Sequence, residues 1–368
     1  MSRLTHRRRA IIAAVGSAVM MSAGACRAAA VPVVAVVALN AGTETTDFLV
    51  PYGVLATSGA VDIHAVSIAA GPVALHPALN VELDETIASF DAAHPAGADV
   101  VIVPAVHDPS DAHLLGWLQQ QAKAGATIVA ICDGVWPVAA AGLLDGKRAT
   151  GHWYSLDRLQ STYPSTTWLR DRRYVRDGTV MTTTGVTASI PASLALVEEL
   201  AGRDSAHKTA ARLGVREWGD AHDSTRFSLT TRDMMAAAGN WLGFWRYERI
   251  GIPVSNGMDE IALALSADAW ARTYRTRVLA VAPSPGTVRL RDGIALLPDA
   301  VDTAGAVDRL EPAPSTGEAP TAALDRTLTS IERAHGAATA DFVALQLEYP
   351  ARRLHLQPRQ EGRASARP

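Results

Sequence analysis

The residues with the clearest potential for chemistry stand together at Cys132, Asp133 and Gly134. A run of apolar, β-prone residues, 126–131, stops at Cys132, and an alanine-rich segment suited to a helix follows Gly134. This order of strand, tight turn and helix is the sequence form of a nucleophile elbow, which lifts the nucleophile out of the sheet. The turn and the helix N-terminus both favour a thiolate, so we expect Cys132 to be a nucleophile. The alternative is a buried structural cysteine at the end of a strand.

The first thirty residues predict export. Residues 1–10 are basic, residues 11–25 are apolar and small, and Arg27–Ala30 offers an A-x-A cleavage site, which together indicate a secretory signal peptide. The apolar core is too short for a membrane span. Arg8–Ile12 matches part of the twin-arginine pattern. We therefore expect a periplasmic or secreted protein, with a lipid anchor at Cys26 as an alternative.

Cleavage after Ala30 would leave Cys132 as the one cysteine of the mature chain. In an oxidising compartment, a thiol without a disulfide partner is a liability unless it is buried or useful. The chain composition therefore favours a functional Cys132.

Composition and charge exclude several classes of function. The chain has 368 residues, 48% hydrophobic and 19% charged, which is typical of one large or two smaller globular domains. Loss of residues 1–30 removes five arginines and no acid, which moves the formal net charge from −3 to about −8. Nothing in this balance suggests a nucleic-acid surface. Metal-ligand spacings and phosphate-binding loops are missing, so we expect no metal and no cofactor, and a small molecule as partner.

The elements that must position Cys132 alternate between strand and helix. Continuous apolar runs predict buried parallel strands, and segments with helical spacing lie between them. This order indicates an α/β protein with a mainly parallel sheet flanked by helices. The strands are expected at 31–39, 63–68, 73–81, 99–104 and 126–131, the helices at 47–58, 111–125, 185–201 and 205–213, and a hairpin at 168–184.

The second half contains a weak internal repeat. Asp259–Leu263 and Asp47–Val50 each place an acidic residue at the start of an apolar helix, and each is followed by a strand, a Pro/Gly turn and a strand ending in an acid. We interpret residues 240–300 as a degenerate copy without a cysteine elbow. The expected organisation is a signal peptide at 1–30, a first domain at 31–215, a second α/β domain at 216–350 and a disordered tail at 351–368.

Several motifs of the chain resemble those of a known family. The chain resembles the PfpI-like cysteine superfamily, which is class I glutamine amidotransferase-like and has a flavodoxin-like fold, and within it the isonitrile hydratases and the amidotransferase-like domains of AraC-type regulators. The resemblance covers residues 31–215 and rests on the motifs DFLVPY at 47–52, AICDG at 130–134, AGLLDGKRATGHW at 141–153, RDG at 176–178 and GVTA at 185–188.

The resemblance implies two partners for Cys132. A carboxylate on the first helix hydrogen-bonds the elbow cysteine in the family, and the matching residue is Asp47, which would donate a hydrogen bond or shuttle a proton. The alternative for Asp47 is a helix N-cap. His152 matches a histidine often found near the cysteine, and would act as a base or form part of the site wall.

The chain departs from the family pattern around the oxyanion. Family enzymes often carry a glycine pair after the strand that matches residues 100–104, where this chain has Ala105, Val106 and His107. The N–H of Asp133 would still supply one donor. The Asp133 carboxylate, when ionised, would raise the pKa of the neighbouring thiol and oppose the helix dipole.

Two functions follow from these residues. The first is cysteine-dependent hydration or hydrolysis of a small electrophile with a carbon–nitrogen bond, with Cys132 as nucleophile, Asp47 as acid and His152 as auxiliary. The second is a non-catalytic ligand-binding or redox-sensing protein of the same fold, without the DNA-binding region of the regulators. Family members often pair as dimers, so we expect either a homodimer or a monomer whose internal copy takes the place of the partner.

Overall fold

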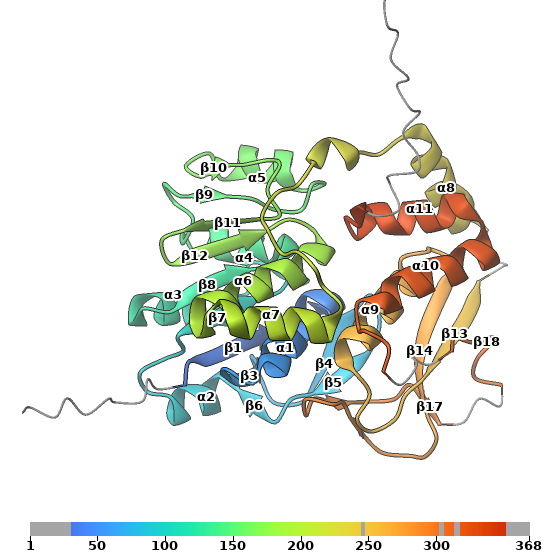
Figure 1. The fold of residues 1–368 in the computed structure, drawn as a ribbon, viewed down its shortest axis with the longest axis horizontal. Helices are drawn as coiled ribbons and strands as arrows, with labels where there is room; N and C mark the ends of the chain where they lie inside the picture. Colours follow the sequence, from blue (N-terminus) through green and yellow to red (C-terminus); the bar gives the residue numbers. More distant parts are fainter. Residues whose placement is uncertain (1–30, 244–246, 302–304, 313–316, 351–368) are drawn as a thin grey trace, which may run out of the picture. The chain divides into compact units, whose positions relative to one another are not determined.

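The computed structural model describes residues 31–243, 247–301, 305–312 and 317–350 (Figure 1). The predicted signal peptide at 1–30 and the predicted tail at 351–368 lie outside these ranges. The described residues belong to one compact unit. Within the described ranges, none of the helices is both long and apolar enough to cross a membrane.

A seven-stranded sheet forms the centre of the first half, in the order β11-β12-β8-β7-β1-β3-β6. Neighbouring strands are parallel except for the β11–β12 hairpin. This arrangement confirms the predicted α/β fold with a mainly parallel sheet. The strands are β1 (Val33–Ala38), β3 (Asp62–Ser67), β6 (Glu85–Thr86), β7 (Val100–Val103), β8 (Thr127–Ala130), β11 (Tyr174–Asp177) and β12 (Val180–Thr183).

Alternate residues of the strands enter two different cores, as the period of two in a strand requires. In β1, Val34 and Val36 belong to one hydrophobic core, whereas Ala35 and Val37 belong to the other. Helices therefore cover both faces of the sheet. The first core contains side chains of α1 (Thr45–Ser58), α6 (Ser189–Ala201) and α7 (Arg203–Leu213), and the second those of α2 (Ile87–Ala93), α3 (Ala112–Ala124), α4 (Val135–Ala140) and α5 (Leu156–Thr162).

The second half has its own parallel sheet of four strands, in the order β17-β14-β13-β18. Its strands are β13 (Glu248–Pro253), β14 (Thr276–Ala282), β17 (Ala300–Val301) and β18 (Arg309–Leu310). Its helices are α8 (Thr231–Leu242), α9 (Glu260–Ala271), α10 (Ala322–His335) and α11 (Ala337–Gln346). Helices α10 and α11 separate at Gly336.

A third sheet joins the two halves. Its order is β15-β16-β5-β4-β2, and β16 of the second half pairs antiparallel with β5 of the first. Helices α1 and α9 also pack together, and residues of both belong to one hydrophobic core. The strands are β2 (Thr43–Glu44), β4 (Pro72–His76), β5 (Asn80–Glu82), β15 (Val288–Arg289) and β16 (Ala295–Leu296), and a separate pair is β9 (Arg148–Ala149) with β10 (Thr167–Trp168). The predicted domain boundary at residue 215 stays a prediction.

The two halves share an order of elements at a constant spacing. Strand β13 begins 215 residues after β1 (33 and 248), and α9 begins 215 residues after α1 (45 and 260). The strand pairs β1–β3 and β13–β14 are both parallel. The helix N-caps, Glu44 and Asp259, are related by the same spacing. The sequence comparison that places Asp47 beside Asp259 is thus three residues out of register, and the counterpart of Asp47 is Ala262.

Candidate active site

The predicted elbow at Cys132 has the backbone of a strained turn. Cys132 has a φ of 54°, in the left-handed region that residues with a side chain seldom occupy. Its N–H donates to Thr183 Oγ1 of β12 at 2.9 Å. Two residues on, a Cβ at Gly134 would lie 2.0 Å from the carbonyl oxygen of Val103, so this position accepts only glycine. The close passage of the turn over β7 explains the glycine at the end of the Cys-Asp-Gly sequence.

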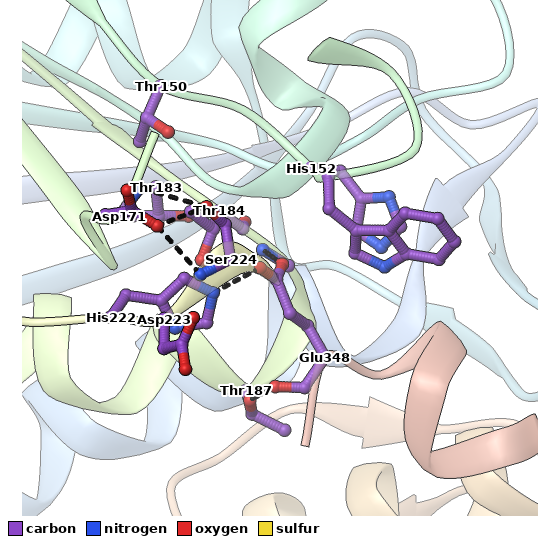
Figure 2. A network of polar contacts seen from close by, with 12 residues as sticks. Thr150, His152, Asp171, Thr183, Thr184, Thr187, His222, Asp223, Ser224 and Glu348 are labelled. Atoms are coloured by element: carbon purple, nitrogen blue, oxygen red, sulfur yellow. Dashed lines mark hydrogen bonds and ion pairs between the residues drawn. The ribbon is translucent and has the colours of Figure 1, made fainter. Parts of the chain in front are cut away.

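A polar network holds the segment behind this turn (Figure 2). The buried carboxylate of Glu348 accepts a hydrogen bond from the Gly185 N–H, and its other oxygen lies 2.7 Å from Nε2 of His222. Thr187 Oγ1 donates to the main-chain oxygen of Glu348 at 2.8 Å. These contacts fix the loop after β12 and, through Thr183, support the main chain at Cys132.

Asp47 lies in the first turn of α1 and is completely buried. The alternative assignment of Asp47 as the helix N-cap is wrong, because Glu44 caps the helix by accepting the Asp47 N–H at 2.5 Å. The Asp47 carboxyl is therefore free for another role. Its Oδ2 accepts the Ala105 N–H at 3.2 Å, while its Oδ1 has no hydrogen-bond partner among the described residues.

The surroundings of Asp47 keep it protonated at neutral pH. Burial raises the pKa of Asp47 to about 8, with Asp268 and Asp133 acting in the same sense and the Ala105 N–H and Arg272 opposing them. A neutral carboxylic acid is a hydrogen-bond donor as well as an acceptor. Asp47 thus has a proton to donate at the pH where most enzymes work.

The same surroundings disfavour the thiolate. Burial raises the pKa of Cys132 well above its ordinary value, and Asp47, Asp133 and Glu44 add to this effect. The expectation that the elbow and the helix N-terminus would lower this pKa is therefore wrong in direction. The helix that follows, α4, has six residues, and the thiol is only 6% exposed. Cys132 and Asp47 both rest in their neutral forms.

Three charged residues that the sequence analysis missed stand beside this pair. Arg272, directly after α9, donates from Nη2 to Glu44 Oε1 and from Nε to Asp268 Oδ1, both at 2.6 Å. Thr46 Oγ1 of α1 donates to Asp268 Oδ2 at 2.9 Å. The guanidinium opposes the carboxyl groups that raise the pKa of Cys132. The spacing of Asp268 and Arg272, four apart at the end of an apolar helix, is the one sequence signal for this ion pair.

His152 lies in the loop after β9, where both nitrogens of its ring contact main-chain groups. Nε2 lies 3.2 Å from the carbonyl oxygen of Gln346, and Nδ1 accepts the Tyr154 N–H at 3.3 Å. A ring that donates from Nε2 and accepts at Nδ1 has no lone pair left for the proton of a thiol. These contacts favour the site-wall role for His152 over the role of base.

The other predicted wall residues have main-chain roles. The Ala105 N–H is occupied by Asp47, and the Ala105 oxygen accepts the Glu44 N–H at 2.8 Å. Val106 forms an isolated bridge with Thr43, and the His107 N–H donates to the Gly42 oxygen at 3.0 Å. The loop 105–107 is thereby held against the start of α1, and it presents a bonded N–H at Ala105 instead of a free oxyanion donor.

The side chains of Asp133 and His107 are also engaged. Asp133 Oδ2 accepts from Ser155 Oγ at 2.9 Å, while Oδ1 is buried without a hydrogen-bond partner among the described residues. The His107 ring stacks on His76 with centroids 3.7 Å apart. Burial, followed by the charge of His107, lowers the pKa of His76.

Comparison with known proteins gives this site a family. Residues 33–199 match the DJ-1/PfpI family. An isonitrile hydratase of Pseudomonas putida is 34% identical over 174 residues, which are 46% of this chain and 73% of that protein. The HTH-type transcriptional regulator CdhR of Pseudomonas aeruginosa is 30% identical over 172 residues, 46% of this chain and 49% of the regulator. The chain thus spans about three quarters of one relative and about half of the other.

Solved structures match about half of the chain. The crystal structure of Drosophila melanogaster DJ-1beta matches with a TM-score of 0.46 and 22% identity, over 50% of this chain and 99% of that one.

Proposed function

Because the chain belongs to the DJ-1/PfpI family through residues 33–199, we propose that it adds water to a small substrate with a carbon–nitrogen multiple bond, through Cys132. The isonitrile hydratase relative makes an isonitrile the first substrate to test. The observations that carry the proposal are the strained elbow at Cys132 and the buried Asp47 acid, which raises the pKa of that thiol. The expected hydrogen bond between Asp47 and Cys132 is not formed in the resting site, where Asp47 Oδ1 has no hydrogen-bond partner among the described residues.

A neutral thiol beside a neutral acid suits addition across an isonitrile. The terminal carbon of an isonitrile accepts both a nucleophile and a proton. The Cys132 sulfur forms the C–S bond while Asp47 donates its proton to that carbon, and the thiol proton then restores the Asp47 acid. The product is a thioimidate ester of Cys132, and the reaction has needed no separate base.

Water completes the reaction. Water attacks the thioimidate carbon to form the C–O bond, with one of its protons going to the nitrogen and the other staying on the new hydroxyl. The C=O bond then forms as the C–S bond breaks, and the hydroxyl proton passes to the Cys132 sulfur. The product is an N-substituted formamide, and Cys132 recovers its proton. The overall change is the addition of one water to one isonitrile, with no oxidation or reduction.

Hydrolysis of an amide fits this site less well. Amide hydrolysis passes through a tetrahedral oxyanion, which needs N–H donors aimed at the developing charge. The Ala105 N–H donates to the Asp47 carboxyl instead. The expected glycine pair is replaced by residues whose main chain is bonded to the start of α1. We therefore place hydration before hydrolysis.

The test is turnover of a simple alkyl isonitrile by the purified protein, followed by NMR detection of the formamide. Cys132→Ala and Asp47→Asn should each abolish turnover. Ser155→Ala, which removes only the hydrogen bond to Asp133, is the matched control and should keep most of it. Formamide production that persists in Cys132→Ala would refute the proposal, as would wild-type protein that leaves a panel of isonitriles and small amides unchanged.

A second function is favoured by the burial of the thiol. Cys132 is 6% exposed with a raised pKa, which suits a ligand-binding or sensing protein as much as an enzyme. A transcriptional regulator is among the relatives, at 30% identity over 46% of this chain. A binding protein would retain isonitriles or related small molecules without converting them, and calorimetry with Cys132→Ala would show affinity in the absence of turnover.

We also propose that residues 1–30 direct export of the chain. The support is the order of basic, apolar and small residues in that segment. Mass spectrometry of the protein recovered from periplasmic and culture fractions tests it. A mature N-terminus near Val31 is expected, and an uncleaved chain confined to the cytoplasm would contradict export.

A further inference from the structure

Resting on the proposed chemistry of Cys132, we infer that Arg272 and Asp268 of the second half are positioning residues for the Cys132 site. The second half then acts as a resident partner that completes the site of the first. Neither residue touches the reacting atoms in this role. They act through Glu44 and the first turn of α1.

The contacts form a continuous path from α9 to Asp47. Arg272 binds Glu44 Oε1 at 2.6 Å, and Glu44 Oε2 accepts the Asp47 N–H at 2.5 Å. The guanidinium is itself held by Asp268, to which Thr46 of α1 donates. The side chains of Glu44 and Asp268 are 12% and 1% exposed in these pairs, so solvent screens them weakly. Arg272 thus fixes the helix turn that carries the acid.

The charge of Arg272 matters as much as its contacts. Burial, Asp47, Asp133 and Glu44 raise the pKa of Cys132, and Arg272 lowers it. Arg272 also opposes the rise in the pKa of Asp47 and of Glu44. Without this cation, the three carboxyl groups of Asp47, Asp133 and Glu44 would act on the thiol unopposed, and each would make the developing thiolate more costly.

The internal repeat shows that this arrangement is asymmetric. With the spacing of 215, Asp268 and Arg272 correspond to Gly53 and Thr57 of the first half. The contact between Thr46 and Asp268 corresponds to the close approach of Gly53 to Ile261, where a Cβ would lie 2.7 Å from a side-chain carbon. The two helices therefore cross about an approximate two-fold axis.

Each half has kept a different part of the site. The first half has Cys132 and Asp47, and the second has Ala262 in place of the acid. The second half has the Asp268–Arg272 pair, and the first has Gly53 and Thr57 in its place. At the equivalent N-cap, Asp259 pairs with Arg291 of its own half. The repeat thus divides nucleophile and charge between its two copies.

Titration of the thiolate tests this inference without any substrate. The absorbance at 240 nm of the full-length mature protein, minus that of Cys132→Ala, gives the apparent pKa of Cys132. Arg272→Gln should raise that pKa by about one unit, which is about a tenfold loss of thiolate at a fixed lower pH. Arg272→Lys keeps the charge and should move it less. Arg291→Gln, the matched control at the other N-cap, should leave it unchanged.

A second variant keeps the test decisive where Arg272→Gln does not fold. Asp268→Asn leaves Arg272 with one carboxylate fewer, so the pKa of Cys132 should fall. A folded Arg272→Gln with an unchanged pKa would overturn the inference, as would an Asp268→Asn that raises the pKa or leaves it in place. A protein that shows both shifts and converts no isonitrile keeps the inference and loses the proposed function. Turnover that depends on Cys132, without either pKa shift, would support the proposed function and overturn the inference.

Discussion

Asp47→Asn should make the protein more stable at neutral pH while it removes activity. The pKa of Asp47 is about 8 in the folded chain, against about 3.9 in an unfolded one. Asparagine has nearly the shape of the neutral acid, and its side-chain oxygen can still accept the Ala105 N–H. The variant therefore removes the ionisation of Asp47 and keeps its known hydrogen bond.

The sign follows from proton linkage. The folded state holds the Asp47 proton at pH values where the unfolded state has released it, because the folded pKa is the higher one. The contribution to stability is full below about pH 4 and is lost as pH rises toward 8, at about 1.4 kcal/mol per pH unit. Between pH 5 and pH 7.5 the wild-type protein should lose about 3 kcal/mol through Asp47 alone.

Urea unfolding of both proteins at pH 5 and pH 7.5 measures this difference. The other buried carboxyl groups titrate in both proteins, so the change in their stability difference isolates Asp47. Asp308→Asn is the control: a hydrogen bond from Arg249 lowers the pKa of Asp308 to about 2, so its stabilisation is already complete above pH 5. A stability difference between Asp47→Asn and wild type that is the same at both pH values would refute a buried neutral acid.

Three further predictions concern the elbow and its neighbours. Gly134→Ala should prevent folding or cost several kcal/mol, because its Cβ would overlap the Val103 oxygen. The control is Gly116→Ala on the exposed face of α3, where the new Cβ has no atom within 4 Å and should stabilise the protein by about 0.5–1 kcal/mol. Thermal unfolding of the two variants measures the difference. His152→Gln should keep turnover within a few-fold of wild type, because both ring nitrogens already bind main-chain groups; a loss as large as that of Cys132→Ala would restore His152 as the base. Iodoacetamide labelling of Cys132 should stay slow below pH 9 and rise at higher pH, because burial raises the pKa of the thiol; fast labelling at pH 7 by mass spectrometry would contradict the neutral resting state.

Local patterns in the sequence predicted much of the fold and part of the site. The apolar run that stops at Cys132 and the Asp-Gly that follows predicted a strand and a tight turn. A strand buries the run, and glycine lets the turn pass close over β7. Alternating strands and helices likewise predicted the parallel sheet, and Asp111 and Gly125 marked the two ends of α3.

The remainder depended on contacts between distant parts of the chain. The N-cap of α1 is Glu44, three residues before Asp47, and glutamate is not a usual N-cap residue. Arg272 reaches Glu44 across 228 positions of sequence, so no local pattern could assign it to the elbow. The direction of the Cys132 pKa was missed as well, because burial and the nearby carboxyl groups outweigh the dipole of a six-residue helix.

The pairing of β16 with β5 has a consequence for how the protein behaves on dilution. A site shared between two separate subunits is lost when the protein concentration falls below their dissociation constant, because the subunits then dissociate. Here the two halves that contribute to the site belong to one polypeptide. Their effective local concentration is set by the chain that links them, and it does not depend on the protein concentration. Activity per molecule should therefore be constant down to the lowest assayable concentration.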